Sequence, residues 1–155
     1  MDRTVEAELS SFITQFDSFI LACDAQEEDC EWDTEEFGPM AAYFQADLSA
    51  VVLHLISADG QFEEAEAEVF NRMFDTQMSA DDLAETFNST DNAITDYCDG
   101  EAQDALETLA GYDCGLDDAY RDLLLSACDV ISLCDGVAEG EEAELIARFR
   151  DALAG

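Results

Sequence analysis

Hydrophobic residues recur at helical spacing along nearly the whole chain, and no alternating strand pattern is present. In the first segment the apolar positions are Val5, Leu9, Phe12, Phe16 and Ile20. Their spacing of three and four residues predicts an amphipathic helix that ends near Cys23. The acidic stretch from Asp24 to Asp33 follows, and we expect it to form a loop.

Six further helical segments are predicted after this loop. Their apolar positions fall within residues 43–56, 69–74, 79–87, 90–112, 116–131 and 145–153. Ser79, followed by Asp82 three residues later, is typical of a helix cap. The pattern therefore predicts an all-α fold, a single bundle of about seven helices. We expect residues 1–39 to pack on a helical domain formed by residues 40–155.

An internal repeat relates the two halves of residues 40–155. A shift of 76 residues places DGQFEEAEAEVFNRMF, at 59–74, on DGVAEGEEAELIARFR, at 135–150. Only five arginines occur in the chain, yet Arg72 and Arg148 coincide. Each follows a glutamate by four residues, which predicts ion pairs within the helix, Glu68 with Arg72 and Glu144 with Arg148. We interpret the repeated unit as a helical hairpin used twice.

The two repeated Asp-Gly turns bring carboxylates together. Asp59 and Asp135 each end a helix, where the helix dipole disfavours an anion, and each faces glutamates across a tight turn. A divalent cation with oxygen ligands, Ca²⁺ or Mg²⁺, would relieve this repulsion. Helix capping and solvation of the same acids is the alternative that the spacing leaves open. The candidate metal ligands are Asp59, Glu63 and Glu66 in the first copy and Asp135, Glu139 and Glu142 in the second.

Charge and composition exclude several classes of function. The chain has 39 Asp and Glu residues against five Arg and no Lys, for a formal net charge of -34. Such a surface repels phosphate backbones, so direct nucleic-acid binding is not expected. Lysine-dependent catalysis is excluded, and the single histidine, His54, lies among apolar residues that indicate packing. We therefore expect no enzymatic activity.

Expectations about location follow from the apolar segments and the cysteines. The N-terminus has no basic region followed by an apolar one, and no apolar run is long enough to cross a bilayer. A cytoplasmic protein without a transmembrane segment is the simplest interpretation. We expect the six cysteines to be mainly buried, reduced thiols.

The repeated motif resembles the TerB-like proteins of tellurite-resistance and related bacterial stress systems. The resemblance rests on ADGQFEEAE at 58–66 and CDGVAEGEE at 134–142, and it covers about residues 40–155. It implies an all-helical fold with two related halves and a metal-binding acidic cluster. That cluster carries over to Asp59 with Glu66 and to Asp135 with Glu142. The resemblance also implies a non-enzymatic interaction module whose partners are other proteins of stress-response complexes, some of them associated with membranes.

The strong acidity of the chain leaves two alternative hypotheses open. A small folded acidic protein can imitate DNA and inhibit a nucleic-acid enzyme, because electrostatic steering favours basic partners. Alternatively, the excess of Asp and Glu is an adaptation to molar salt, and the protein is an adaptor without a metal site.

Overall fold

The computed structural model describes residues 3–56, 62–89, 97, 105–112, 115–133 and 141–154, except the side chains of residues 141, 142 and 154. Within these ranges the ordered elements are eight helices, and no strand is present. The helices are α1 (Arg3–Gln26), α2 (Thr34–Phe37), α3 (Met40–Ile56), α4 (Glu64–Phe74), α5 (Ala80–Ser89), α7 (Ala105–Gly111), α8 (Asp117–Leu133) and α9 (Glu141–Ala154). The predicted all-α fold is confirmed.

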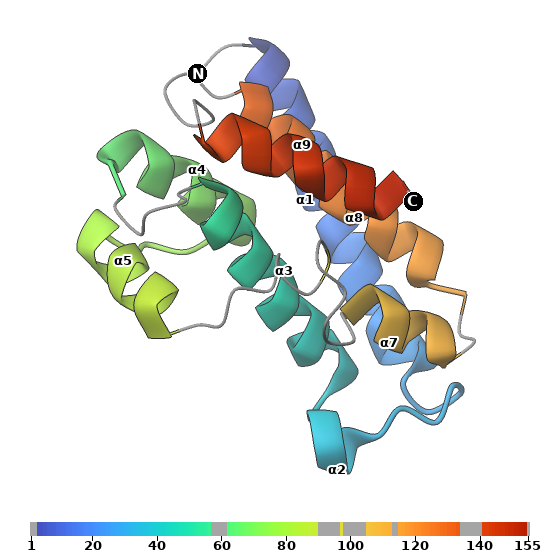
Figure 1. Cartoon of the computed structure of the whole chain (residues 1–155). Coiled ribbons are helices and arrows are strands. Elements are labelled where there is room, and N and C mark those ends of the chain that lie inside the picture. The colour runs from blue at the N-terminus through green and yellow to red at the C-terminus, as the bar shows by residue number, and fades with distance from the viewer. Residues whose placement is uncertain are drawn as a thin grey trace.

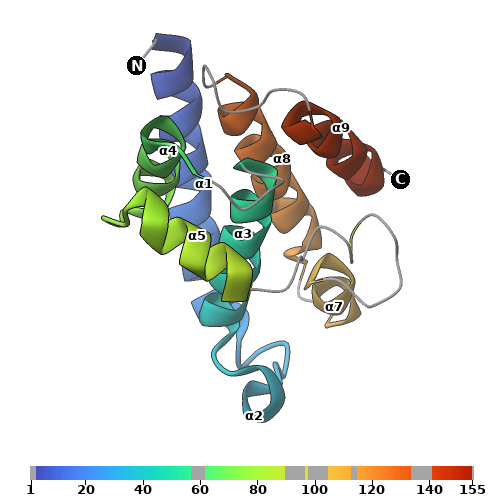
Figure 2. The ribbon, with the colours of Figure 1, turned by 60° about the vertical axis from the view of Figure 1, so that its left-hand side comes forward.

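Helix α3 lies at the centre of the molecule. It contacts α1, α4, α5, α8 and α9, and Figure 2 shows α4 and α5 on one side of it and α8 and α9 on the other. The sequence explains this position, because every residue from 50 to 56 is buried. A helix that is apolar all round is stable only when other elements cover all of its faces.

The core takes large side chains from four helices. Fully buried aromatic residues come from α1, α3, α8 and α9: Phe12, Phe44, Tyr120 and Phe149. Helix α1 packs along α8 over much of its length, and the two run antiparallel (Figures 1 and 2). The N-terminal helix therefore contributes to the same hydrophobic core as the later helices.

The acidic stretch after α1 has more order than a plain loop. Helix α1 continues to Gln26, past the predicted end at Cys23, and the short α2 follows. Oδ1 of Asp33 accepts a hydrogen bond of 3.1 Å from the backbone N–H of Glu36 in α2. Oε2 of Glu27 accepts one of 2.8 Å from the backbone N–H of Met40, the first residue of α3. Two of the acidic side chains thus cap helix N-termini, where negative charge is stabilising.

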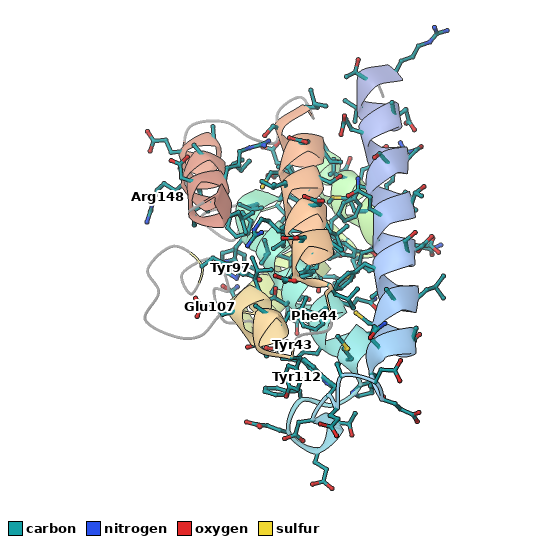
Figure 3. All side chains as sticks on the ribbon, turned by 90° about the vertical axis from the view of Figure 1, so that its right-hand side faces the viewer. Tyr43, Phe44, Tyr97, Glu107, Tyr112 and Arg148 are labelled. Atoms are coloured by element: carbon teal, nitrogen blue, oxygen red, sulfur yellow. The ribbon has the colours of Figure 1, made fainter. Side chains whose placement is uncertain are left out.

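Trp32 packs the segment between α1 and α3 against the helical bundle. Its side chain is buried, and its ring lies 4.7 Å from that of Tyr112 and 5.4 Å from that of Phe44, measured between centroids. Its indole Nε1 donates a hydrogen bond of 3.0 Å to the carbonyl oxygen of Gly38. Figure 3 shows Tyr43, Phe44 and Tyr112 gathered at this end of the molecule. The aromatic cluster buries apolar surface, which the acidic side chains of this segment cannot do.

The helices of the two repeat copies begin at corresponding positions in the sequence. Shifted by 76 residues, the starts of α3 and α4 fall one residue before those of α8 and α9. Phe44 and Tyr120 are equivalent under the same shift, and their rings lie 5.1 Å apart in an edge-to-face arrangement. A duplicated hairpin would produce this agreement.

Candidate metal-binding turns

The described residues include part of the predicted metal site. Glu63 and Glu66 lie at the start of α4. Asp59, Asp135 and Glu139 lie outside the described residues, and Glu142 belongs to α9 but its side chain is also outside them. Convergence of these acids on a cation therefore stays a prediction.

Glu63 and Glu66 form a capping box at the N-terminus of α4. The backbone N–H of Glu63 donates a hydrogen bond of 2.8 Å to Oε1 of Glu66, and the Glu63 carboxylate accepts from the backbone N–H of Glu66. Each side chain thus satisfies a backbone donor that the helix itself leaves unpaired. Glu66 is only 6% exposed, although it is a charged residue. A cation at this turn would have to share carboxylate oxygens that already cap α4.

The sequence leaves helix capping open as a role for these acids, but it does not predict the reciprocal bonds between Glu63 and Glu66. Capping boxes normally start with Ser or Thr, whereas here Glu63 takes that position. The spacing of three residues between the two glutamates was the signal available. In the described ranges, the start of α4 included, no group of three or more His, Cys, Asp or Glu side chains is arranged to hold a metal ion.

Arg72 joins α4 to the N-terminal helix. Its Nη1 and Nη2 lie 2.5 Å and 2.7 Å from Oε1 and Oε2 of Glu6 in α1. The prediction that Arg72 pairs with Glu68 in its own helix is therefore wrong, because the guanidinium reaches across to α1. The hydrogen bonds from Arg72 lower the pKa of Glu6 below its ordinary value of 4.5, since they favour the ionised carboxylate.

Two side chains of types that often act in catalysis, those of His54 and Cys128, are buried. His54 is buried, and its ring lies 4.1 Å from that of Phe87, which confirms the interpretation of this residue as a packed side chain. Burial raises the pKa of the Cys128 thiol to about 12, so this thiol is not ionised near neutral pH. Within the described ranges, Cys23, Cys30 and Cys128 are not in disulfide bonds, and Cys98, Cys114 and Cys134 lie outside those ranges.

Together these features define an acidic protein whose described elements are all helices. A sequence model of the family described as "Tellurite resistance protein TerB" matches residues 45–154. The chain belongs to this family, and the match begins inside α3, so that α1 and α2 precede it.

Other comparisons add no relative. Neither curated proteins nor solved structures give a match to this chain. None of the helices in the described ranges combines the length and apolar content needed to cross a membrane.

Proposed function

We propose that this protein is a non-enzymatic module of a tellurite-resistance-like stress system. It binds a divalent cation, Ca²⁺ or Mg²⁺, at the duplicated Asp-Gly turns and acts through contacts with other proteins. Membership of the TerB family supports the assignment to such a system.

The observation that carries the proposed metal site is the position of Glu66. Its carboxylate is nearly buried and held at the first turn of α4, seven residues after Asp59. A carboxylate fixed by a backbone hydrogen bond loses little conformational freedom when it binds an ion. Oxygen ligands of this kind suit a hard cation, and Asp59 would complete the first site. Asp135 and Glu142 would form the equivalent pair in the second copy.

The absence of an enzymatic role is proposed on chemical grounds. His54 is packed against Phe87, and the Cys128 thiol has a pKa too high for a nucleophile. Neither group is suited to activate a substrate.

Calorimetric titration with Ca²⁺ and Mg²⁺ at fixed high ionic strength tests the metal site. The wild type is compared with a variant carrying Asp59→Asn and Asp135→Asn, and with a control carrying Glu35→Gln and Glu36→Gln in the exposed α2. Both variants lose two negative charges, so general charge effects are matched. We expect binding to be lost only in the aspartate variant.

Stability provides a second measurement. An ion at 100 times its dissociation constant stabilises a one-site protein by about 2.7 kcal/mol. An unchanged isotherm and unchanged stabilisation in the aspartate variant would remove these turns from the mechanism. Equal losses in both variants would show that the ion only screens the overall charge.

A further inference from the structure

A groove of about 530 Å³ opens between α4 and α5. Its apolar lining consists of Ala67, Met78 and Ala80, and Asn71, Arg72 and Ser79 also line it. Carboxylates stand on both walls, Glu64 and Glu68 on α4 and Asp81 on α5. Figures 1 and 2 show the two helices side by side at the edge of the molecule.

The acidic side chains of this groove are uncompensated. Glu64 and Glu68 are four residues apart on one helix, a like-charge spacing that is mildly destabilising. Asp81 lies in the first turn of α5, across the groove. All three are exposed, and none of them forms an ion pair or a side-chain hydrogen bond within the described ranges. A cationic group placed between the walls would relieve their repulsion.

Arg72 is the cationic residue that lines the groove, but its charge is paired with Glu6 of α1. It lies four residues after Glu68, yet both of its terminal nitrogens bind the Glu6 carboxylate on α1. Arg72 lines the groove, but its guanidinium is paired with Glu6, which is not a lining residue. The contact between α1 and α4 therefore pairs the charge of Arg72 with Glu6 rather than with the carboxylates of the groove.

Hydrogen bonds fix the shape of the groove in advance. Nδ2 of Asn71 donates to the carbonyl oxygen of Met78 over 2.8 Å, and its Oδ1 accepts from the backbone N–H of Met78 over 2.9 Å and from Oγ1 of Thr76 over 2.7 Å. Ser79 and Asp82 then form reciprocal capping bonds of 3.1 Å at the start of α5. Little conformational entropy remains to be lost when a ligand enters a groove that is already formed.

We propose that the α4–α5 groove docks a basic segment of a partner protein. An apolar side chain of that segment packs on Ala67, Met78 and Ala80, and lysines or arginines on either side reach the carboxylates of the two walls. Met78 suits this role because its flexible thioether adapts to different apolar shapes. Charge complementarity selects this occupant, since nucleic acid is repelled and a second copy of this chain has no lysine and only five arginines.

This inference rests on the interaction-module part of the proposed function and is independent of the metal site. The groove residues lie outside the Asp-Gly turns. Peptide binding in the groove can therefore be absent while cation binding is present, and the reverse. Variants of the groove keep Asp59 and Asp135 intact.

The test uses a fluorescein-labelled synthetic peptide in which pairs of lysines flank a single leucine between Gly-Ser ends. Affinity is measured by anisotropy at about 0.3 M KCl, where diffuse attraction is largely screened. Glu64→Gln with Glu68→Gln should weaken binding about tenfold, whereas the α2 control, Glu35→Gln with Glu36→Gln, should change it less than about twofold. Loss of the glutamate charges removes a repulsion, so the groove variant should remain folded.

Two further measurements distinguish docking of the peptide in the groove from general electrostatic attraction between the basic peptide and the acidic protein. Met78→Ser leaves the charge and the backbone hydrogen bonds in place, and it should weaken binding several-fold because the apolar anchor loses its contact. In amide NMR spectra the peptide should shift resonances of α4 and α5. Equal weakening in the groove and α2 variants, no effect of Met78→Ser, or no binding to the wild type at about 1 mM peptide would each overturn the proposal.

Discussion

The hydroxyl of Tyr120 in α8 donates a hydrogen bond of 2.5 Å to Oδ2 of Asp47 in α3. The same carboxylate oxygen accepts a hydrogen bond of 2.7 Å from the hydroxyl of Tyr97. Tyr120 is fully buried, and its burial raises its pKa well above 10, so it stays a protonated donor. This contact ties together the central helices of the two hairpins.

Removing the Tyr120 hydroxyl should destabilise the fold. Tyr120→Phe keeps the ring and its packing but deprives Asp47 of one donor, so we expect the free energy of unfolding to fall by about 1.5–3 kcal/mol. Urea denaturation measures the change. Tyr112→Phe is the control, because the Tyr112 hydroxyl forms no hydrogen bond with other described residues. Equal effects of the two substitutions would contradict a role for the Asp47 contact.

Breaking the ion pair between Glu6 and Arg72 should raise the pKa of Glu6. In the wild type the pKa of Glu6 lies below 4.5 because Arg72 donates hydrogen bonds to the ionised carboxylate. In Arg72→Gln it should rise towards 4.5, which a carbon-detected NMR titration can follow. The stability that this pair supplies is present above the unfolded-state pKa and is lost as the pH falls through the lower folded-state value. The same Glu6 pKa in both proteins would show that the ion pair does not persist in solution.

Trp32 should report whether the N-terminal segment unfolds with the bundle. It is the only tryptophan, and it packs against Phe44 of α3 and Tyr112. Denaturation followed by its fluorescence should therefore coincide with denaturation followed by far-ultraviolet circular dichroism. Trp32→Ala should cost about 3–5 kcal/mol. A fluorescence transition at clearly lower denaturant would instead make the segment an independently unfolding unit.

Cys128 should resist alkylation in the folded protein. Its pKa of about 12, caused mainly by burial, leaves almost no thiolate at pH 8. With iodoacetamide labelling and peptide mapping, the partly exposed Cys30 should be modified before Cys128, which should react only in denaturant. Rapid native labelling of Cys128 would mean that the contact between α8 and its neighbours opens readily.

Much of the fold and part of the candidate site could be predicted from local sequence. The apolar period placed the long helices, because that period depends only on residues within a few positions of one another. The cap at Ser79 was predicted for the same reason, and its reciprocal bonds with Asp82 are present. Glu63 and Glu66 were identified as important at the start of α4, although their mutual capping was not. The capping alternative that the spacing leaves open is present at Glu63 and Glu66.

The sequence by itself determined the helices, their amphipathic faces and the excess of negative charge. Only the tertiary structure decided which charges meet: Arg72 binds Glu6, which lies 66 residues earlier, and Tyr120 binds Asp47, which lies 73 residues earlier. Helical period orients a side chain relative to its own helix, but its partner depends on how helices distant in sequence cross and pack. The groove between α4 and α5 arises in the same way, because Asp81 of α5 faces Glu64 and Glu68 of α4 only when these two helices pack together.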